Sequence, residues 1–284
     1  GTGAVLNIIL DPIMITAMSA QGKGIEGAAY ATVASQIVTA AITLWYFLTK
    51  SKVVRIHRVR LESSLISEIL GVGFSAMLMQ VMTMVQQTTL YHVAARHGGD
   101  TWQIILGAAL SIQSFTMIPL WGAGQGFQPA AGTNYGAKQY DRVKQVTRAF
   151  MVGVTVLSLI FYIPIQLAPK TILSWFIKDA GIVSQGVADF RILFSTYILL
   201  GFVLMVITLM QSLGKASKAS VLVMMRQIIL FVPLAILLPQ IGGLGAHGVF
   251  LAPAVTDSII LILAIVLLAG EFRNISKLAT QEQR

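Results

Sequence analysis

The chain has 284 residues, of which 56% are hydrophobic and only 11% are charged, and its formal net charge is +9. One soluble core could not hide so much apolar surface, so most of the chain is expected to lie in lipid. The positive residues stand in short blocks between apolar runs, which is typical of membrane topology and argues against nucleic acid as a partner. The absence of cysteine excludes disulfides and thiolate metal sites.

Apolar runs long enough to cross a bilayer recur along the whole chain. A spanning helix needs about 20 apolar residues. In chain order the runs cover residues 4–18, 27–49, 69–95, 101–123, 149–169, 192–214, 219–238 and 245–270. The sequence therefore predicts an all-α polytopic membrane protein with a partial first helix and seven further spanning helices.

The distribution of Lys and Arg predicts one orientation. Most of these residues fall in four segments, 50–63, 135–148, 214–218 and 271–284, which follow every second apolar run. Because cytoplasmic loops carry the excess of positive charge, all four segments are predicted to be cytoplasmic. We therefore expect a cytoplasmic C-terminus in a membrane of the bacterial inner (plasma) type.

Two parts of the chain align without gaps as a candidate repeat. Residues 24–36 match 245–257 at two glycines and one alanine, with Gly27 opposite Gly248. Either small residues recur by chance at helix starts, or the chain holds parts of two homologous halves. In the second case a complete first half would have six helices, about four of them upstream of residue 1.

Several motifs in series resemble the multidrug and toxic compound extrusion (MATE) family. The first are Asn7-Ile-Ile-Leu-Asp11-Pro12 and Gly24-x-x-Gly27-Ala-Ala-x-Ala31-Thr32. They are followed by Pro129-x-x-Gly-x-Asn134-Tyr135-Gly136-Ala137-Lys138 with Arg142-Val143, by Arg226-Gln227, and by Ala252-Pro253-x-x-x-Asp257. The resemblance covers essentially the whole chain in the family's order.

The resemblance implies two six-helix bundles that face each other across a central cavity. On this basis residues 1–49 are the end of the N-terminal bundle (helices 5 and 6), residues 50–63 a basic inter-lobe loop, residues 64–270 the C-terminal six-helix bundle, and residues 271–284 a tail. Family members export organic cations or drugs in exchange for Na⁺ or H⁺. The resemblance therefore implies a transporter, not an enzyme, with no organic cofactor.

The same resemblance implies the partners of the protein. They are cationic amphiphilic small molecules and the lipid bilayer, and we expect the complete protein to be monomeric. A lipid-linked oligosaccharide flippase of the same superfamily is the alternative, but a flippase would be expected to carry more cationic side chains in its cavity. A membrane-embedded enzyme would need an acid, base or nucleophile cluster, and the sequence offers none.

An ionisable carboxylate, Asp11, interrupts the first apolar run. A charged side chain at mid-span costs about 2.5–3.5 kcal/mol, so it normally faces a cavity or a partner. Asn7 lies one turn earlier on the same helix face, and Pro12 removes a backbone donor, so hard oxygen atoms can share one ligand there. Na⁺ and H⁺ both fit this description; a structural hydrogen bond or a helix end at Asp11 is the alternative.

By resemblance, Asn7 and Asp11 match family residues of a cation site in the N-terminal bundle, and Thr32 is a further match on the next helix. The family places another acidic residue of this site on helix 1, which the sequence does not contain. We therefore expect the 284 residues by themselves not to transport.

A stripe of methionine and glutamine follows the basic loop. Met77, Gln80, Met84 and Gln87 lie on one helix face, where polarizable and amide groups would suit aromatic cations; a helix-packing face is the alternative. Members resembling the NorM subgroup carry carboxylates on helices 7 and 10. Here Gln80 stands on the seventh, and no acid occurs in 192–214, so we expect no such carboxylate pair.

Arg226 and Asp257 are ionisable residues in the last two apolar runs. Since an unpaired charge in the bilayer is costly, either they pair with each other or each meets a polar cavity. We favour the pair, with a gating or proton-linked role as the second hypothesis. The glycines of Gly122-x-Gly124-x-Gly126 follow a spanning run without a preceding strand, so a hinge or tight turn is predicted there in preference to a phosphate loop.

Overall fold

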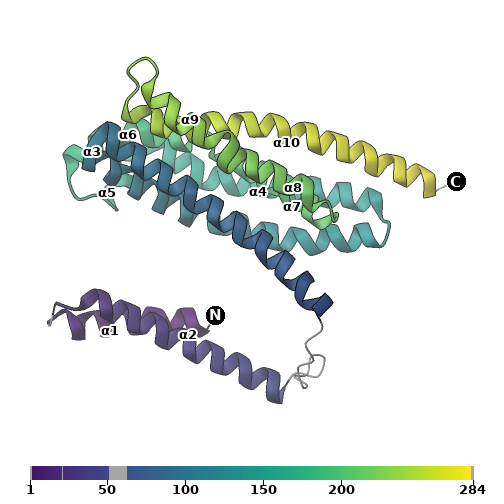
Figure 1. The fold of residues 1–284 in the computed structure, drawn as a ribbon, viewed down its shortest axis with the longest axis horizontal. Coiled ribbons are helices and arrows are strands. Elements are labelled where there is room, and N and C mark those ends of the chain that lie inside the picture. Colours follow the sequence, from purple (N-terminus) through teal and green to yellow (C-terminus); the bar gives the residue numbers. More distant parts are fainter. Residues whose placement is uncertain (1, 21, 51–62, 283–284) are drawn as a thin grey trace. The chain divides into compact units, whose positions relative to one another are not determined.

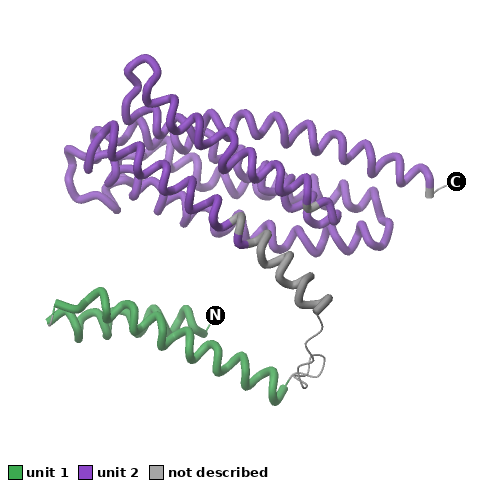
Figure 2. The backbone as a smooth tube through the Cα atoms, in the orientation of Figure 1, with its two compact units in different colours: residues 1–69 green, residues 70–284 purple. Residues whose placement is uncertain are grey.

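The computed structural model describes residues 2–20, 22–50 and 63–282. The chain divides into two compact units, unit 1 (Gly1–Ile69) and unit 2 (Leu70–Arg284), shown in Figure 2. All regular structure in the described ranges is helical, so the predicted all-α fold is confirmed. The predicted basic loop 50–63 lies almost entirely outside the described residues.

Unit 1 is a helical hairpin of α1 (Thr2–Ser19) and α2 (Gly24–Thr49), which lie side by side in Figure 1. The buried face of α2 consists of Gly27, Ala31 and Ser35, spaced one turn apart. A Cβ atom on Gly27 would lie 2.5 Å from the carbonyl oxygen of Met14. Small residues therefore let the two backbones approach closely, as is common between membrane helices.

The other helices belong mainly to unit 2. In chain order they are α3 (Ser63–Gly136), α4 (Tyr140–Leu167), α5 (Pro169–Ser174), α6 (Ala180–Phe194), α7 (Tyr197–Ser212), α8 (Ala216–Met224), the π-helical turn η1 (Met225–Ile229), α9 (Phe231–Leu237), the 3₁₀ turn η2 (Leu238–Gln240) and α10 (Ala246–Glu282). In α10 the helix continues through most of the segment that the sequence analysis assigned to the tail.

α3 consists of two helical segments that meet at Gly99. This residue has φ +66° and ψ −161°, outside the helical region, and glycine adopts such a conformation without a steric penalty. The two predicted runs 69–95 and 101–123 therefore fall on either side of the kink. The second segment continues to Gly136 with Gly122, Gly124 and Gly126 inside the helix. The predicted tight turn at these glycines is therefore wrong, and a hinge there stays a prediction.

The core of unit 2 forms around α7, which packs against α4, α8 and α10. The largest buried side chains include Phe190, Phe194 and Tyr197, at the junction of α6 and α7. The hydroxyl of Tyr197 donates a 2.8 Å hydrogen bond to the backbone oxygen of Thr116, which ties this junction to α3.

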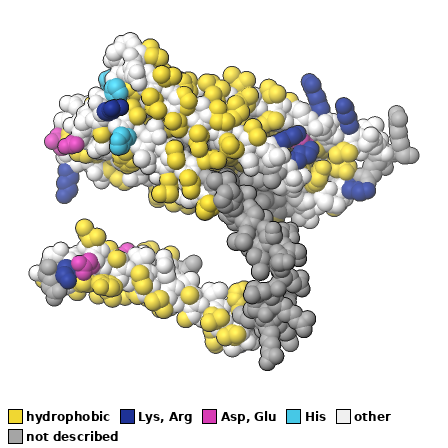
Figure 3. Space-filling model, in the orientation of Figure 1, with side chains coloured by type: hydrophobic (Ala, Val, Ile, Leu, Met, Phe, Trp, Pro, Cys, Tyr) yellow, Lys and Arg dark blue, Asp and Glu magenta, His cyan; other side chains and the backbone are white. Residues whose placement is uncertain are grey.

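Seven helical stretches in the described ranges are long and apolar enough to cross a membrane. One of them, Gln80–Gly136, has 57 residues and contains the Gly99 kink, so at about 1.5 Å per residue it suffices for two spans. The count agrees with the predicted eight runs. On the face of unit 2 seen in Figure 3, hydrophobic side chains cover the middle, and Lys and Arg gather toward the two ends.

The two parts of the candidate repeat share one packing feature. A Cβ atom on Gly248, at the start of α10, would lie 2.5 Å from the backbone nitrogen of Pro239 in η2. Gly27 has the same close approach to the helix that precedes it, α1. Equivalent glycines at equivalent crossings favour a true repeat over chance recurrence.

Candidate functional site

The structure brings the three predicted cation-site residues together in unit 1. The amide Nδ2 of Asn7 donates hydrogen bonds to Oδ1 of Asp11 at 3.2 Å and to Oγ1 of Thr32 at 3.5 Å. The first contact joins neighbouring turns of α1, and the second crosses to α2. Asn7 and Thr32 also border a pocket of about 500 Å³ between the two helices.

This group of side chains contains hard oxygen atoms of the kind that sodium binds. They are the carboxylate of Asp11, the amide oxygen of Asn7 and the hydroxyl of Thr32. The Asn7 amide now presents its nitrogen to the carboxylate; rotated by half a turn, it would present its oxygen on the same side. The geometry is compatible with a small cation or with a proton on Asp11.

The two charged residues of the last spans form an ion pair. Nε of Arg226 donates to Oδ1 of Asp257 at 2.7 Å, and the hydroxyl of Thr196 lies 3.4 Å from Oδ2. Asp257 is buried, whereas the Arg226 side chain retains a quarter of its exposure. The pair that the sequence analysis favours is present, and it joins η1 to α10.

The predicted methionine and glutamine stripe lies on the first segment of α3. Met77, Gln80, Met84 and Gln87 are all exposed in unit 2, so they do not fill its core. Met84 and Gln87 border a pocket of about 330 Å³ whose other lining residues include Tyr91. The helix-packing interpretation therefore finds no support inside this unit.

A buried carboxylate, Asp189, lies outside the apolar runs and was not foreseen from the sequence. The helical stretch Ala180–Ser212 begins twelve residues before the predicted run 192–214, so Asp189 lies inside it. No acid occurs in the predicted run 192–214 itself, but the apolar helical stretch begins earlier than predicted and includes this carboxylate in α6. A signal was present in the sequence: Asp179 caps α6 by accepting hydrogen bonds from the backbone of Gly181 and Ile182, and Asp is a preferred N-cap residue.

Asp189 pairs with a histidine at the start of α10. Its Oδ1 lies 2.7 Å from Nδ1 of His247, and its Oδ2 has no hydrogen-bond partner among the described residues. Asp189 is fully buried, while the His247 side chain is 56% exposed. The ring of Trp102 packs edge-on against the imidazole, with the ring centroids 5.0 Å apart.

A second missed carboxylate, Glu271, lies in α10 within the segment assigned to the tail. It is almost completely buried and forms ion pairs with Lys215 and with Lys218, the latter at 3.6 Å. These residues flank the start of α8. These ion pairs therefore connect the turn between α7 and α8 to α10.

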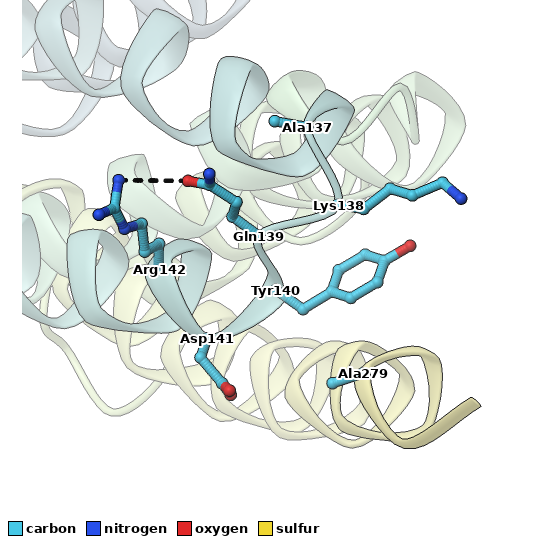
Figure 4. A pocket seen from close by; sticks show the side chains of 7 residues that line it. All are labelled: Ala137, Lys138, Gln139, Tyr140, Asp141, Arg142 and Ala279. Atoms are coloured by element: carbon cyan, nitrogen blue, oxygen red, sulfur yellow. Dashed lines mark hydrogen bonds between the residues drawn. The ribbon is translucent and has the colours of Figure 1, made fainter. Parts of the chain in front are cut away.

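The turn after α3 forms a shallow pocket of about 550 Å³, shown in Figure 4. The guanidinium of Arg142 donates to Oε1 of Gln139 at 3.3 Å, and Ala279 of α10 lines the opposite side. In this turn Lys138 adopts φ +58°. The N-cap residue of α4, Gln139, makes no capping hydrogen bond through its side chain.

Comparison with known proteins identifies relatives over most of the chain. The chain is 22% identical over 265 residues to the multidrug export protein MepA of Staphylococcus saprophyticus, and this match covers 93% of the chain and 57% of MepA. It is 25% identical over 260 residues to an FAD transporter of Shewanella oneidensis, with 89% of the chain and 56% of that protein covered. The chain thus spans a little over half the length of these relatives.

Solved structures share the fold. A crystal structure of MATE in complex with MaL6 superposes with a TM-score of 0.86 at 23% identity, covering 97% of the chain and 62% of that protein. An outward-facing multidrug resistance MATE family transporter of the MOP superfamily gives 0.85 at 23% identity, with the same coverage. The sequence profile of the MatE family matches residues 72–237. The chain therefore belongs to the MatE family, whose members include multidrug transporters.

Proposed function

We propose that the protein is a secondary active antiporter that exports organic cations or drugs in exchange for Na⁺ or H⁺. The observation that carries this proposal is the convergence of Asn7, Asp11 and Thr32 in an apolar helical hairpin. An ionised carboxylate in the membrane is costly in free energy unless it binds a cation or a proton. The amide and hydroxyl groups beside Asp11 add oxygen ligands for such a coupling ion. The family and the multidrug export relatives support a transport role in preference to catalysis.

A flippase for lipid-linked oligosaccharides is the weaker alternative. Recognition of a pyrophosphate group would favour several cations in the cavity. In the last two spans of unit 2 the described residues offer one such cation at depth, Arg226, which falls short of several. We further propose that the protein acts as a monomer in a bacterial-type inner membrane with its C-terminus in the cytoplasm.

The proposal predicts that Asp11→Asn abolishes ion-coupled export, because the amide cannot carry the charge that binds Na⁺ or the proton that the carboxylate releases. The measurement is efflux of ethidium from membrane vesicles. The vesicles contain the full-length protein that includes these residues. Sodium and pH gradients are imposed separately, so the gradient that drives efflux identifies the coupling ion.

Asp141→Asn is the matched control, because this carboxylate is 72% exposed and its oxygen lies 3.6 Å from Nζ of Lys144. It should leave efflux unchanged. Undiminished gradient-driven efflux by Asp11→Asn at equal expression would refute the assignment of the coupling site.

A further inference from the structure

A second polar site lies in unit 2, apart from the Asn7–Asp11–Thr32 group. A groove of about 300 Å³ runs between α3, α7 and the junction of α8 with η1. We call it the glutamine pocket, because its polar lining comes from the side chains of Gln125, Gln128, Gln211, Gln227 and Arg226, together with Thr208. Its size is at the lower end of the range for small-molecule sites.

Arg226 brings unused hydrogen-bond donors to this pocket. A guanidinium has five N–H donors in a planar fork. Its Nε–H is taken by Asp257, and among the described residues the structure gives the two terminal nitrogens no hydrogen bond. The ion pair therefore holds the guanidinium in place while the outer edge of the fork, which fits a carboxylate in two-point contact, stays available.

Gln227 supplies the second observation that indicates a ligand. Its Nε2 donates to Oγ1 of Thr83 at 3.3 Å, whereas its Oε1 is buried without a hydrogen-bond partner in the described part of the chain. A buried amide atom with no partner is costly, and a bound polar group would remove that cost. The amide can be turned, so this position offers a ligand either an acceptor or a donor.

The remaining lining favours a flat ring beside the polar group. Trp121 borders the pocket from α3 and is 64% exposed, so its ring face is available for stacking. The residues that line the pocket include no carboxylate. An organic cation would therefore find no opposite charge on these walls, while an anion would find the Arg226 fork.

We propose that the glutamine pocket binds planar aromatic carboxylates, with the carboxylate on Arg226 and the glutamine amides and the ring against Trp121. Only the transport role of the pocket rests on the proposed export function. In that role the pocket would add acidic and zwitterionic aromatic molecules to the exported substrates. Binding itself can be measured without transport.

The test uses the 284-residue chain in lipid nanodiscs and isothermal titration with 1-naphthoate, after subtraction of the heat from empty nanodiscs. We expect saturable binding that a cation with the same rings, (1-naphthylmethyl)trimethylammonium, does not displace. Arg226→Lys keeps a positive charge beside Asp257 but removes the fork, so it should weaken binding by about tenfold or more. Equal displacement by the cation would overturn the proposal.

Two glycine variants on α3 provide a matched pair. A Cβ atom on Gly124 would lie 3.5 Å from Oγ1 of Thr208 and 3.7 Å from Cε of Met205, so the methyl groups of Gly124→Val would occupy the pocket. Gly122 lies outside the lining and a Cβ atom there meets nothing within 4 Å. Gly124→Val should abolish naphthoate binding and Gly122→Val should preserve it, with thermal unfolding of both variants as the folding check.

The outcomes separate the two proposals. If naphthoate binding is absent, or persists unchanged in Gly124→Val and Arg226→Lys, the glutamine pocket is refuted even if ethidium efflux and its dependence on Asp11 are intact. If naphthoate binds as described but the complete protein shows no gradient-driven efflux, the export function is refuted and the binding site stands.

Discussion

His247 stabilises a carboxylate that is far more buried than itself. Asp189 is fully buried and His247 is half exposed, so removal of the imidazole leaves a desolvated carboxylate without its partner. We predict that His247→Ala destabilises unit 2 by about 1–3 kcal/mol and lowers its thermal midpoint. The measurement is thermal unfolding in detergent, followed by intrinsic fluorescence.

His97→Ala is the control for this prediction, because His97 is exposed, and it should change the midpoint little. The double variant His247→Ala with Asp189→Leu should recover part of the loss, because no buried charge then remains. If the two substitutions simply add, the loss comes from the imidazole packing against Trp102 and not from the buried carboxylate.

At the residue scale, the sequence predicts contacts within a helix better than contacts between helices. Asn7 and Asp11 are one turn apart, and their contact follows from the helical repeat alone. The pair Arg226 and Asp257 was predictable because two isolated charges in lipid need partners. Asp189 and His247 are 58 positions apart, and both lie near the ends of apolar runs, where hydropathy assigns no burial.

Among the helices, the packing of α1 on α2 leads to a prediction about two glycines. Even the single methyl group of Gly27→Ala would lie 2.5 Å from the Met14 carbonyl oxygen, so the helices must separate. We expect a destabilisation of about 1–3 kcal/mol. In Gly153→Ala the methyl group meets nothing within 4 Å, and the higher helix propensity of alanine should stabilise α4 by up to about 1 kcal/mol.

The readout is the thermal midpoint of each variant in the same detergent. A midpoint for Gly27→Ala at or above that of the unsubstituted chain would show that the close approach does not constrain the hairpin.

Helix interiors were predictable from the sequence, but helix ends were not. Apolar runs identify the middle of each span, because a segment inside the hydrocarbon core must be apolar and helical. The ends depend on local packing and capping: α3 continues through three glycines to Gly136, and α6 begins at the capped residue Ala180. At these ends polar and small residues remain helical because neighbouring helices pack against them. Hydropathy along the sequence does not report such packing.

At the scale of the whole molecule, the absence of cysteine makes the predicted topology directly testable. A single Thr280→Cys near the predicted cytoplasmic end, or Lys178→Cys in a predicted external loop, would be the sole thiol of the chain, and both positions are exposed. A membrane-impermeant maleimide applied to intact cells should label Lys178→Cys and spare Thr280→Cys. Both should react after permeabilisation; the reverse pattern in intact cells would invert the topology.

The overall architecture was the most predictable level. Composition and charge blocks alone predict an all-α membrane protein, and the motif series predicts the family to which the chain belongs. The glutamine pocket could not be foreseen, because its lining comes from α3, α7 and η1, and only packing brings these segments together.

The contact between Arg226 and Asp257 depends on the π-helical turn η1. Such a turn holds one residue more than the regular α-helix, and each residue rotates a helix by about 100°. If the turn tightened by one residue, everything on its N-terminal side would swing by that angle relative to α9. Arg226 would then leave Asp257, so a single change of register in one helix would both open this ion pair and reshape the wall of the glutamine pocket.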